Sequence, residues 1–196
     1  MSDNTRVAWT EGMFLRPQHF QQSDKHISNV IKQVCNSNLV SPWGIVDLSI
    51  NTELLSTGQF AVESLFAITP DLFPIEMPQS AVLPEPLIVS KDVYDQVIYL
   101  AIPALKNSGV NLSDAEDKTV TRYKLHDLTV SDDLLGSQSQ EIIQVAKVHS
   151  KLMLSSDDHS GYIVLPLARI IEVSSEGAIK LDSKYIPPCL KVGLNK

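Results

Sequence analysis

The chain has 196 residues, of which 43% are hydrophobic and 20% charged, and this composition is that of an ordinary globular protein. Sixteen Lys and Arg residues against 23 Asp and Glu residues give a net charge of −7, and without a basic cluster the chain is not expected to bind nucleic acid. The eight glycines are widely spaced, which excludes the glycine-rich phosphate loops of dinucleotide-binding and P-loop enzymes.

The first segment has the alternation of an extended chain. Every second residue from Val7 to Leu15 falls on one side of such a chain, and Gly12 interrupts it. Pro17 suits the first turn of a helix, where no N–H is needed, and it keeps Arg16 out of helical geometry. The segment is therefore expected to pass from a strand-like stretch into a helix that begins at Pro17.

Residues 17–36 are predicted to form one amphipathic helix. Apolar side chains recur at helical spacing, and the polar residues 36–38 end the pattern. Core packing is the favoured interpretation of this apolar stripe, and a subunit interface is the alternative, because helix faces serve both purposes. The stripe consists of Phe20, Ile27, Val30, Ile31 and Val34.

After the helix, the apolar period changes to that of strands. Strands are predicted within residues 46–68, 96–105, 119–130 and 142–154, and a hairpin joins residues 162–173 to 178–181. Five prolines between residues 70 and 86 indicate a loop or an edge strand. Strands at this spacing without intervening helices predict an antiparallel β-sandwich, so the fold class is mainly β with one N-terminal α-helix.

No pattern of residues predicts catalysis. His19 and His26 lie about 10 Å apart along the predicted helix, which is too far for one metal ion. Residues 157–161 have the composition of a solvated turn. Trp9 and Trp43 could stack on a sugar, but packing is the better interpretation where only 6% of residues are aromatic. We therefore expect no enzymatic activity, no cofactor and no metal.

No segment has the length and apolar character of a signal peptide or a membrane span. The longest stretch without Asp, Glu, Lys or Arg covers residues 33–46 and is half polar. Cys35 and Cys189 show no metal-binding spacing and are expected to be free thiols. These features predict a soluble, cytoplasmic protein that does not insert directly into a membrane.

Residues 7–22 carry a more specific pattern. They read Val-Ala-Trp-Thr-Glu-Gly-Met-Phe-Leu-Arg-Pro-Gln-His-Phe-Gln-Gln and resemble, at every fixed position, the N-terminal signature of TssK (ImpJ/VasE), a family of type VI secretion baseplate subunits. The resemblance implies a partner-binding or structural role for Trp9, Glu11, Gly12, Met13, Phe14, Leu15, Pro17, Gln18, His19, Phe20 and Gln21.

Weaker resemblance to the family extends along the rest of the chain. It includes Trp43-Gly44, Leu54-Leu55, Gly58 and residues 170–188, which end in Ile186-Pro187-Pro188. At residues 67–74 the chain departs from the family, because many members have an Asp-Gly turn there. The departure concerns the geometry of that turn.

The resemblance implies a domain organisation and a set of partners. Residues 1–190 would form a β-sandwich like the shoulder domain of a phage receptor-binding protein, including the helix at 17–36. Residues 191–196 would begin a linker to a helical neck and a C-terminal head. Family members are expected to form homotrimers, to dock through this domain on TssG and TssF of the baseplate wedge, and to contact TssL and TssM of the membrane complex through the C-terminal part.

The role implied is that of a structural adaptor in the cytoplasm, associated with the secretion apparatus of the inner membrane. A carbohydrate-binding β-sandwich module is the alternative, since fold alone does not settle function. Replacement of Trp9 or Phe20 by Ala is expected to cost about 3–5 kcal/mol, the usual cost for a buried aromatic side chain.

Overall fold

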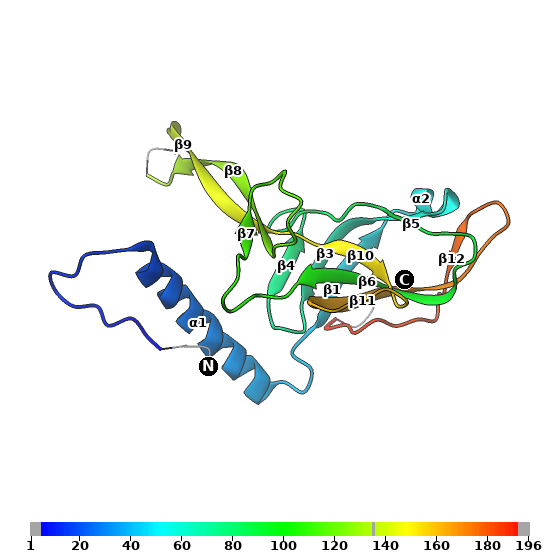
Figure 1. The fold of residues 1–196 in the computed structure, drawn as a ribbon, viewed down its shortest axis with the longest axis horizontal. Coiled ribbons are helices and arrows are strands. Elements are labelled where there is room, and N and C mark those ends of the chain that lie inside the picture. Colours follow the sequence, from blue (N-terminus) through cyan, green and yellow to red (C-terminus); the bar gives the residue numbers. More distant parts are fainter. Residues whose placement is uncertain (1–4, 135, 192–196) are drawn as a thin grey trace. The chain divides into compact units, whose positions relative to one another are not determined.

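A computed structural model describes residues 5–134 and 136–191 (Figure 1). The chain divides into two compact units, one that precedes Trp43 and one that begins at Trp43. We call the described part of the first, residues 5–42, the helical unit, and the described part of the second the β unit. Among the described residues, no helix is both long and apolar enough to cross a membrane.

The helical unit is built on one helix, α1 (Pro17–Asn38). It begins at the predicted proline and ends two residues beyond the predicted end. Two polar side chains of the last turn close it, since the Ser37 hydroxyl donates to the Gln33 carbonyl and the Asn38 amide donates to the Val34 carbonyl, both at 2.8 Å. The predicted helix is therefore confirmed.

The β unit contains two larger antiparallel sheets. The first has the order β1-β3-β4 and the second has the order β10-β6-β11-β12. The bounds in the first sheet are β1 (Gly44–Ile50), β3 (Val62–Ile68) and β4 (Pro74–Met77). Those in the second are β6 (Tyr94–Pro103), β10 (Lys151–Leu154), β11 (Tyr162–Val173) and β12 (Ile179–Leu181).

The hydrophobic core contains residues from both of these sheets. Apolar side chains alternate along β6, where Ile98, Leu100 and Ile102 are all fully buried. They pack in one cluster with residues of the first sheet such as Ile45 and Leu65. This arrangement, with the antiparallel pairing, confirms the predicted fold class.

Further elements complete the β unit. The strands β2 (Gln59–Phe60) and β5 (Leu87–Ile88) pair with each other. The strands β8 (Tyr123–Asp132) and β9 (Gly136–Val148) pair antiparallel, and β7 (Leu112–Ser113) pairs in parallel with the beginning of β8. A short helix, α2 (Thr52–Ser56), follows β1.

Four predictions concern these elements. The expectation of no helix among the strands was wrong, because α2 forms where the Asn51 side chain accepts the Leu54 N–H at 3.0 Å. The single strand expected at 142–154 is two strands, β9 and β10, with His149 and Ser150 between them. The proline-rich segment does contain an edge strand, β4, as predicted. The hairpin of β11 and β12 is also confirmed.

The end of the described chain lies along β1. The Ile45 N–H donates to the Pro188 carbonyl and the Leu190 N–H donates to the Ile45 carbonyl, both at 2.8 Å. A side chain at Gly44 would place its Cβ atom 3.0 Å from the Pro188 oxygen. Gly44 therefore permits the close approach of the two segments.

Candidate functional site

The N-terminal motif lies in the helical unit. The ring of Trp9 has its centre 6.2 Å from that of Phe20 and 6.4 Å from that of His19. Farther along the helix, the Gln22 amide donates to the Thr5 carbonyl at 2.8 Å. These contacts hold the segment before α1 against the first turns of the helix, and they bring together the aromatic residues of the motif.

The segment that approaches the helix contains a turn and no strand. Gly12 adopts a φ of +76°, and the Met13 N–H donates to the Thr10 carbonyl at 3.3 Å. Glycine adopts such a left-handed conformation without strain. The predicted interruption at Gly12 is therefore present, whereas the prediction of a strand around it was wrong. Among the described residues, no strand pairs with this segment.

The start of α1 explains three positions of the motif. Arg16 is extended, with φ −131° and ψ 154°, as the following Pro17 requires. The His19 N–H donates to the Arg16 carbonyl, and the Arg16 N–H donates to Nδ1 of His19, each at 3.0 Å. His19 therefore satisfies a backbone donor that the beginning of a helix would otherwise leave open.

The apolar stripe of α1 is exposed. No residue of α1 is buried, and the exposed fraction of its large apolar side chains lies between 46% and 57%. Within the helical unit the favoured prediction of core packing was therefore wrong, and the exposed stripe is consistent with the alternative, an interface. The stripe has the spacing of a helix-docking face, and its members are Phe20, Ile27, Val30, Ile31 and Val34.

The motif residues before the helix are similarly open. Phe14 is 82% exposed, and Trp9 and Leu15 are about half exposed. Met13 is partly buried, and Glu11 and Gln18 are exposed. The structure thus brings the motif together as one compact turn and helix start, and it leaves most of its large apolar side chains accessible.

Two of the side-chain groups considered for other functions have structural roles. The Asp157 carboxylate accepts the Leu154 N–H at 2.8 Å, and Nε2 of His159 lies 2.9 Å from the Leu154 carbonyl, as expected of a turn. Trp43 packs against the hydrophobic core. Within the described residues, no group of three or more His, Cys, Asp or Glu side chains is placed to hold a metal ion.

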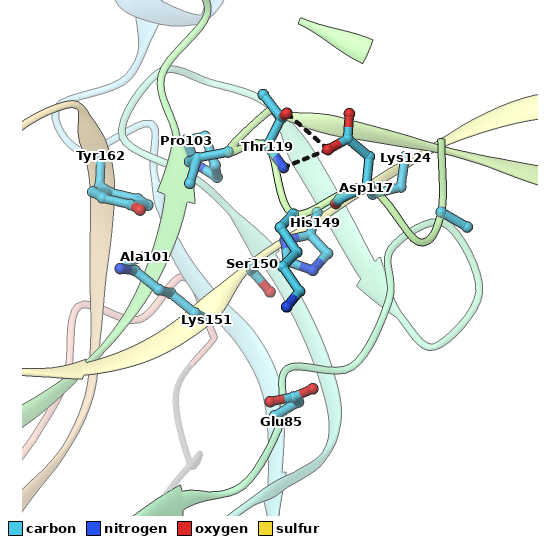
Figure 2. A pocket seen from close by; sticks show the side chains of 13 residues that line it. Glu85, Ala101, Pro103, Asp117, Thr119, Lys124, His149, Ser150, Lys151 and Tyr162 are labelled. Carbon is cyan, nitrogen blue, oxygen red and sulfur yellow. Dashed lines mark hydrogen bonds between the residues drawn. The ribbon is translucent and has the colours of Figure 1, made fainter. Parts of the chain in front are cut away.

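The β unit contains a half-open pocket that the sequence analysis missed (Figure 2). Its volume is about 360 Å³, and it is lined by side chains from β6, β8, β10 and β11 and from the loops beside them. Ser150, which is buried, and His149, which is exposed, belong to this lining and lie in the connection between β9 and β10. In the sequence, the only signal was the run of polar residues between two apolar strands.

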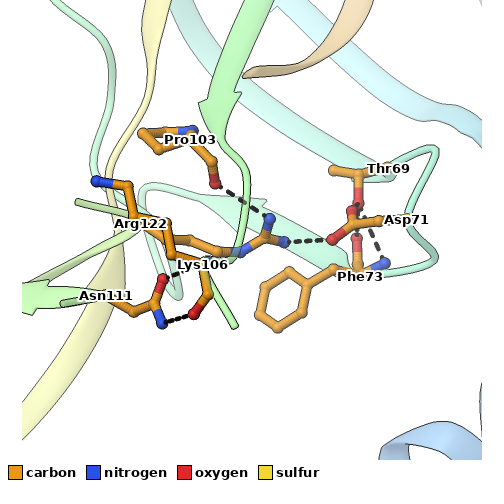
Figure 3. A network of polar contacts seen from close by, with 7 residues as sticks. All are labelled: Thr69, Asp71, Phe73, Pro103, Lys106, Asn111 and Arg122. Atoms are coloured by element: carbon orange, nitrogen blue, oxygen red, sulfur yellow. Dashed lines mark hydrogen bonds and ion pairs between the residues drawn. The ribbon is translucent and has the colours of Figure 1, made fainter. Parts of the chain in front are cut away.

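The β unit also contains a buried charge that was not predicted (Figure 3). The Arg122 side chain is fully buried, and its Nη2 atom lies 2.9 Å from Oδ2 of Asp71. The guanidinium also lies over the Phe73 ring, 5.0 Å from its centre, and donates to the Pro103 carbonyl at 3.3 Å. This ion pair fastens the turn at residues 69–73 to the beginning of β8.

That turn is the place where the sequence departs from the family pattern. Leu72 has a φ of +59°, a conformation that an Asp-Gly turn would give to glycine. The Thr69 N–H donates to the Phe73 carbonyl at 3.0 Å, and the Thr69 hydroxyl donates to the Asp71 carboxylate. The ion pair and these hydrogen bonds hold Leu72 in its left-handed conformation.

Comparison with known proteins gives consistent results at the level of sequence. Residues 19–196 match the model of a bacterial type VI secretion family described by its members EvfL, ImpJ and VasE. The chain is 34% identical over 194 residues to the type VI secretion system baseplate component TssK1 of Pseudomonas aeruginosa strain PAO1. The match covers 98% of this chain and 44% of TssK1, so the chain spans less than half the length of that relative.

Solved structures agree with the sequence match. A crystal structure of TssK matches with a TM-score of 0.87 at 27% identity, over 98% of this chain and 44% of that one. A TssK–TssF–TssG baseplate subcomplex determined by cryo-electron microscopy contains a chain that matches with a TM-score of 0.87 at 25% identity, over 97% of this chain and 64% of that one. The fold and the sequence therefore point to the same group of proteins.

Proposed function

The chain belongs to the bacterial type VI secretion family of EvfL, ImpJ and VasE, and from this membership we propose that it acts as a structural component of the secretion baseplate. The observation that carries the proposal is its likeness, over nearly its whole length, to a chain of a TssK–TssF–TssG subcomplex. Its role would be that of an adaptor without enzymatic activity.

In this role, the chain would dock on TssG and TssF. The helical unit supplies the surface that we assign to docking, because its motif and the stripe of α1 expose large apolar side chains beside polar ones. Apolar anchors framed by polar residues are typical of protein interfaces. The residues proposed to bind a partner or to shape this surface are the motif residues Trp9, Glu11, Gly12, Met13, Phe14, Leu15, Pro17, Gln18, His19, Phe20 and Gln21.

The remaining features of the proposal come from the family resemblance. Residues 1–190 would act as the shoulder domain of a homotrimer, and residues 191–196 as the start of a linker. Contacts with TssL and TssM would be made by parts of family members beyond the stretch that this chain matches. The protein would work in the cytoplasm beside the inner membrane.

Co-purification with TssG and TssF tests the docking role. The wild-type chain is expected to retain both proteins, and the double variant Ile27→Glu/Ile31→Glu is expected to lose them, because two carboxylates would have to be desolvated at the interface. The matched control is Asn36→Glu, which adds a carboxylate at least about 120° around the helix from the stripe. If the wild-type chain retained neither protein, or if the double variant retained both, docking through α1 would be wrong.

Light scattering of the 196-residue chain tests self-association. A trimer is expected if the shoulder itself carries the subunit contacts. A monomer at the same concentration would contradict trimerisation through residues 1–190.

A further inference from the structure

The pocket of the β unit has a rigid frame. Lys151 of β10 pairs with Ala101 of β6, and Tyr162 of β11 pairs with Pro103 of β6, so three neighbouring strands form one wall. The His149 N–H donates to the Arg122 carbonyl at 2.9 Å, which fixes the connection between β9 and β10. The backbone of this wall is therefore held by strand pairing and by this hydrogen bond.

A buried hydroxyl in this wall has no partner. Ser150 is only 4% exposed, and within the described part of the chain its Oγ atom makes no hydrogen bond. It belongs to the lining of the pocket, as Figure 2 shows. Buried polar groups are normally hydrogen-bonded, because leaving one unpaired loses its hydration without compensation. A ligand in the pocket would supply the missing partner.

Three lysines line the same pocket. Lys124 is almost completely buried, and its Nζ atom donates to the carbonyls of Asp114 and Asp117. An ammonium has three N–H groups, so one more is available for a ligand. The other two ammonium groups belong to Lys118 and to Lys151, whose Nζ lies 4.4 Å from the centre of the Tyr162 ring.

The lining contains fewer carboxylates than lysines, so an excess of positive charge remains at the pocket. Oδ1 of Asp117 already accepts the N–H and the hydroxyl of Thr119, at 2.9 and 2.8 Å. Glu85 is the other carboxylate in the lining. Burial first, and then the charge of Lys124, lower the pKa of His149, which favours the neutral imidazole, and a neutral imidazole can donate one hydrogen bond.

We propose that this pocket binds a carboxylate group, carried either by a small dicarboxylic acid or by an acidic side chain of a peptide segment. The Ser150 hydroxyl, the ammonium groups and the His149 imidazole are donors that suit one monoanion. Ala101, Pro103 and Val120 offer an apolar wall for the carbon chain. A cation would meet the lysines, and the lining contains no arginine, the residue that pairs with phosphate through two parallel hydrogen bonds. The proposal does not depend on a role in the baseplate.

Nuclear magnetic resonance titration of the ¹⁵N-labelled 196-residue chain tests the proposal. Glutarate and the blocked peptide acetyl-Ala-Glu-Ala-amide are the probes, and glutaramide and acetyl-Ala-Gln-Ala-amide are the matched neutral controls. We expect saturable shifts of the Ser150 and Lys151 amide signals with at least one acidic probe and none with its control. Binding of glutarate alone would identify a small acid as the source, and binding of the peptide would identify a partner segment.

Substitutions locate the binding. Ser150→Ala and Lys151→Gln are each expected to raise the dissociation constant about tenfold, as the loss of a charge-assisted hydrogen bond does. Ser156→Ala, in an exposed turn, serves as the control and should bind like the wild type. Lys151 is exposed, so its variant remains informative if Ser150→Ala fails to fold. Equal shifts with acidic and neutral probes, no shifts at all, or unchanged binding by folded Lys151→Gln would overturn the proposal.

Discussion

The ion pair between Arg122 and Asp71 provides a sharp test of the fold, because its two partners differ in burial. The Arg122 side chain is fully buried, whereas the Asp71 side chain is 23% exposed. Removal of one partner from a buried pair leaves an uncompensated charge, and the cost depends on whether that charge can regain water. The two single substitutions are therefore expected to have unequal effects.

Asp71→Ala should be the more damaging change. It leaves the guanidinium buried with the Pro103 carbonyl and the Phe73 ring as its neighbours, at 3.3 and 5.0 Å, and the expected loss is about 3–5 kcal/mol. Arg122→Met leaves a carboxylate that keeps the hydrogen bond from Thr69 and contact with water. Since Met also refills the volume, we expect a loss of about 1–2 kcal/mol.

Urea unfolding followed by circular dichroism measures both free energies, and the double variant completes the cycle. The double variant should be more stable than Asp71→Ala alone, because no charge is left buried. If Asp71→Ala were no less stable than Arg122→Met, the reasoning from unequal burial would be refuted. If the double variant lost the sum of both costs, the two residues would not be coupled.

The remaining predictions concern a glycine, a histidine and two aromatic residues. Gly58→Ala should lower the free energy of unfolding more than Gly161→Ala. The two glycines have similar φ values, +78° and +80°, but only at Gly58 would the new Cβ lie 2.9 Å from a backbone oxygen. Equal losses in urea unfolding would contradict this. Burial lowers the pKa of His149 in the folded chain from its ordinary value of 6.5. Below about pH 6.5 the unfolded chain therefore binds more protons than the folded one, and the free energy of unfolding falls. In thermal unfolding, the decrease in melting temperature from pH 7.5 to pH 5.5 should be smaller for His149→Gln than for the wild type. Trp9→Ala and Phe20→Ala should each cost less than about 3 kcal/mol in urea unfolding, because both side chains are half exposed; larger losses would indicate burial.

The parts of the fold that the sequence predicted correctly are those with a local physical signal. Pro17 marks the start of α1 because a proline fits the first turn of a helix, and polar side chains close its end. The hairpin of β11 and β12 is marked by a turn in which the Ser174 N–H donates to the Ala178 carbonyl at 2.8 Å. Regular alternation was sufficient for the strands that supply the core.

The features that could not be predicted depend on residues far apart in sequence. The pairing of Arg122 with Asp71 requires β8 to meet the turn after β3, and no pattern near either residue signals it. The pocket around Ser150 likewise requires four strands and loops that are far apart in sequence. The exposure of the α1 stripe was mispredicted for a related reason, because an amphipathic helix has the same periodicity whether its apolar face meets a core or a partner.

The structure separates the N-terminal motif into residues that set the backbone and residues that are presented. Gly12 forms the turn, Pro17 begins the helix, and His19 caps it through the Arg16 N–H. Most of the large apolar side chains held by this framework, among them Phe14, are half exposed or more. Side chains whose only role is to fill a core are buried. Apolar side chains that are merely exposed to water do not require a backbone that is fixed by so many contacts. The combination favours a surface built to present its apolar side chains to a partner, in which the order of the backbone lowers the entropy lost on docking.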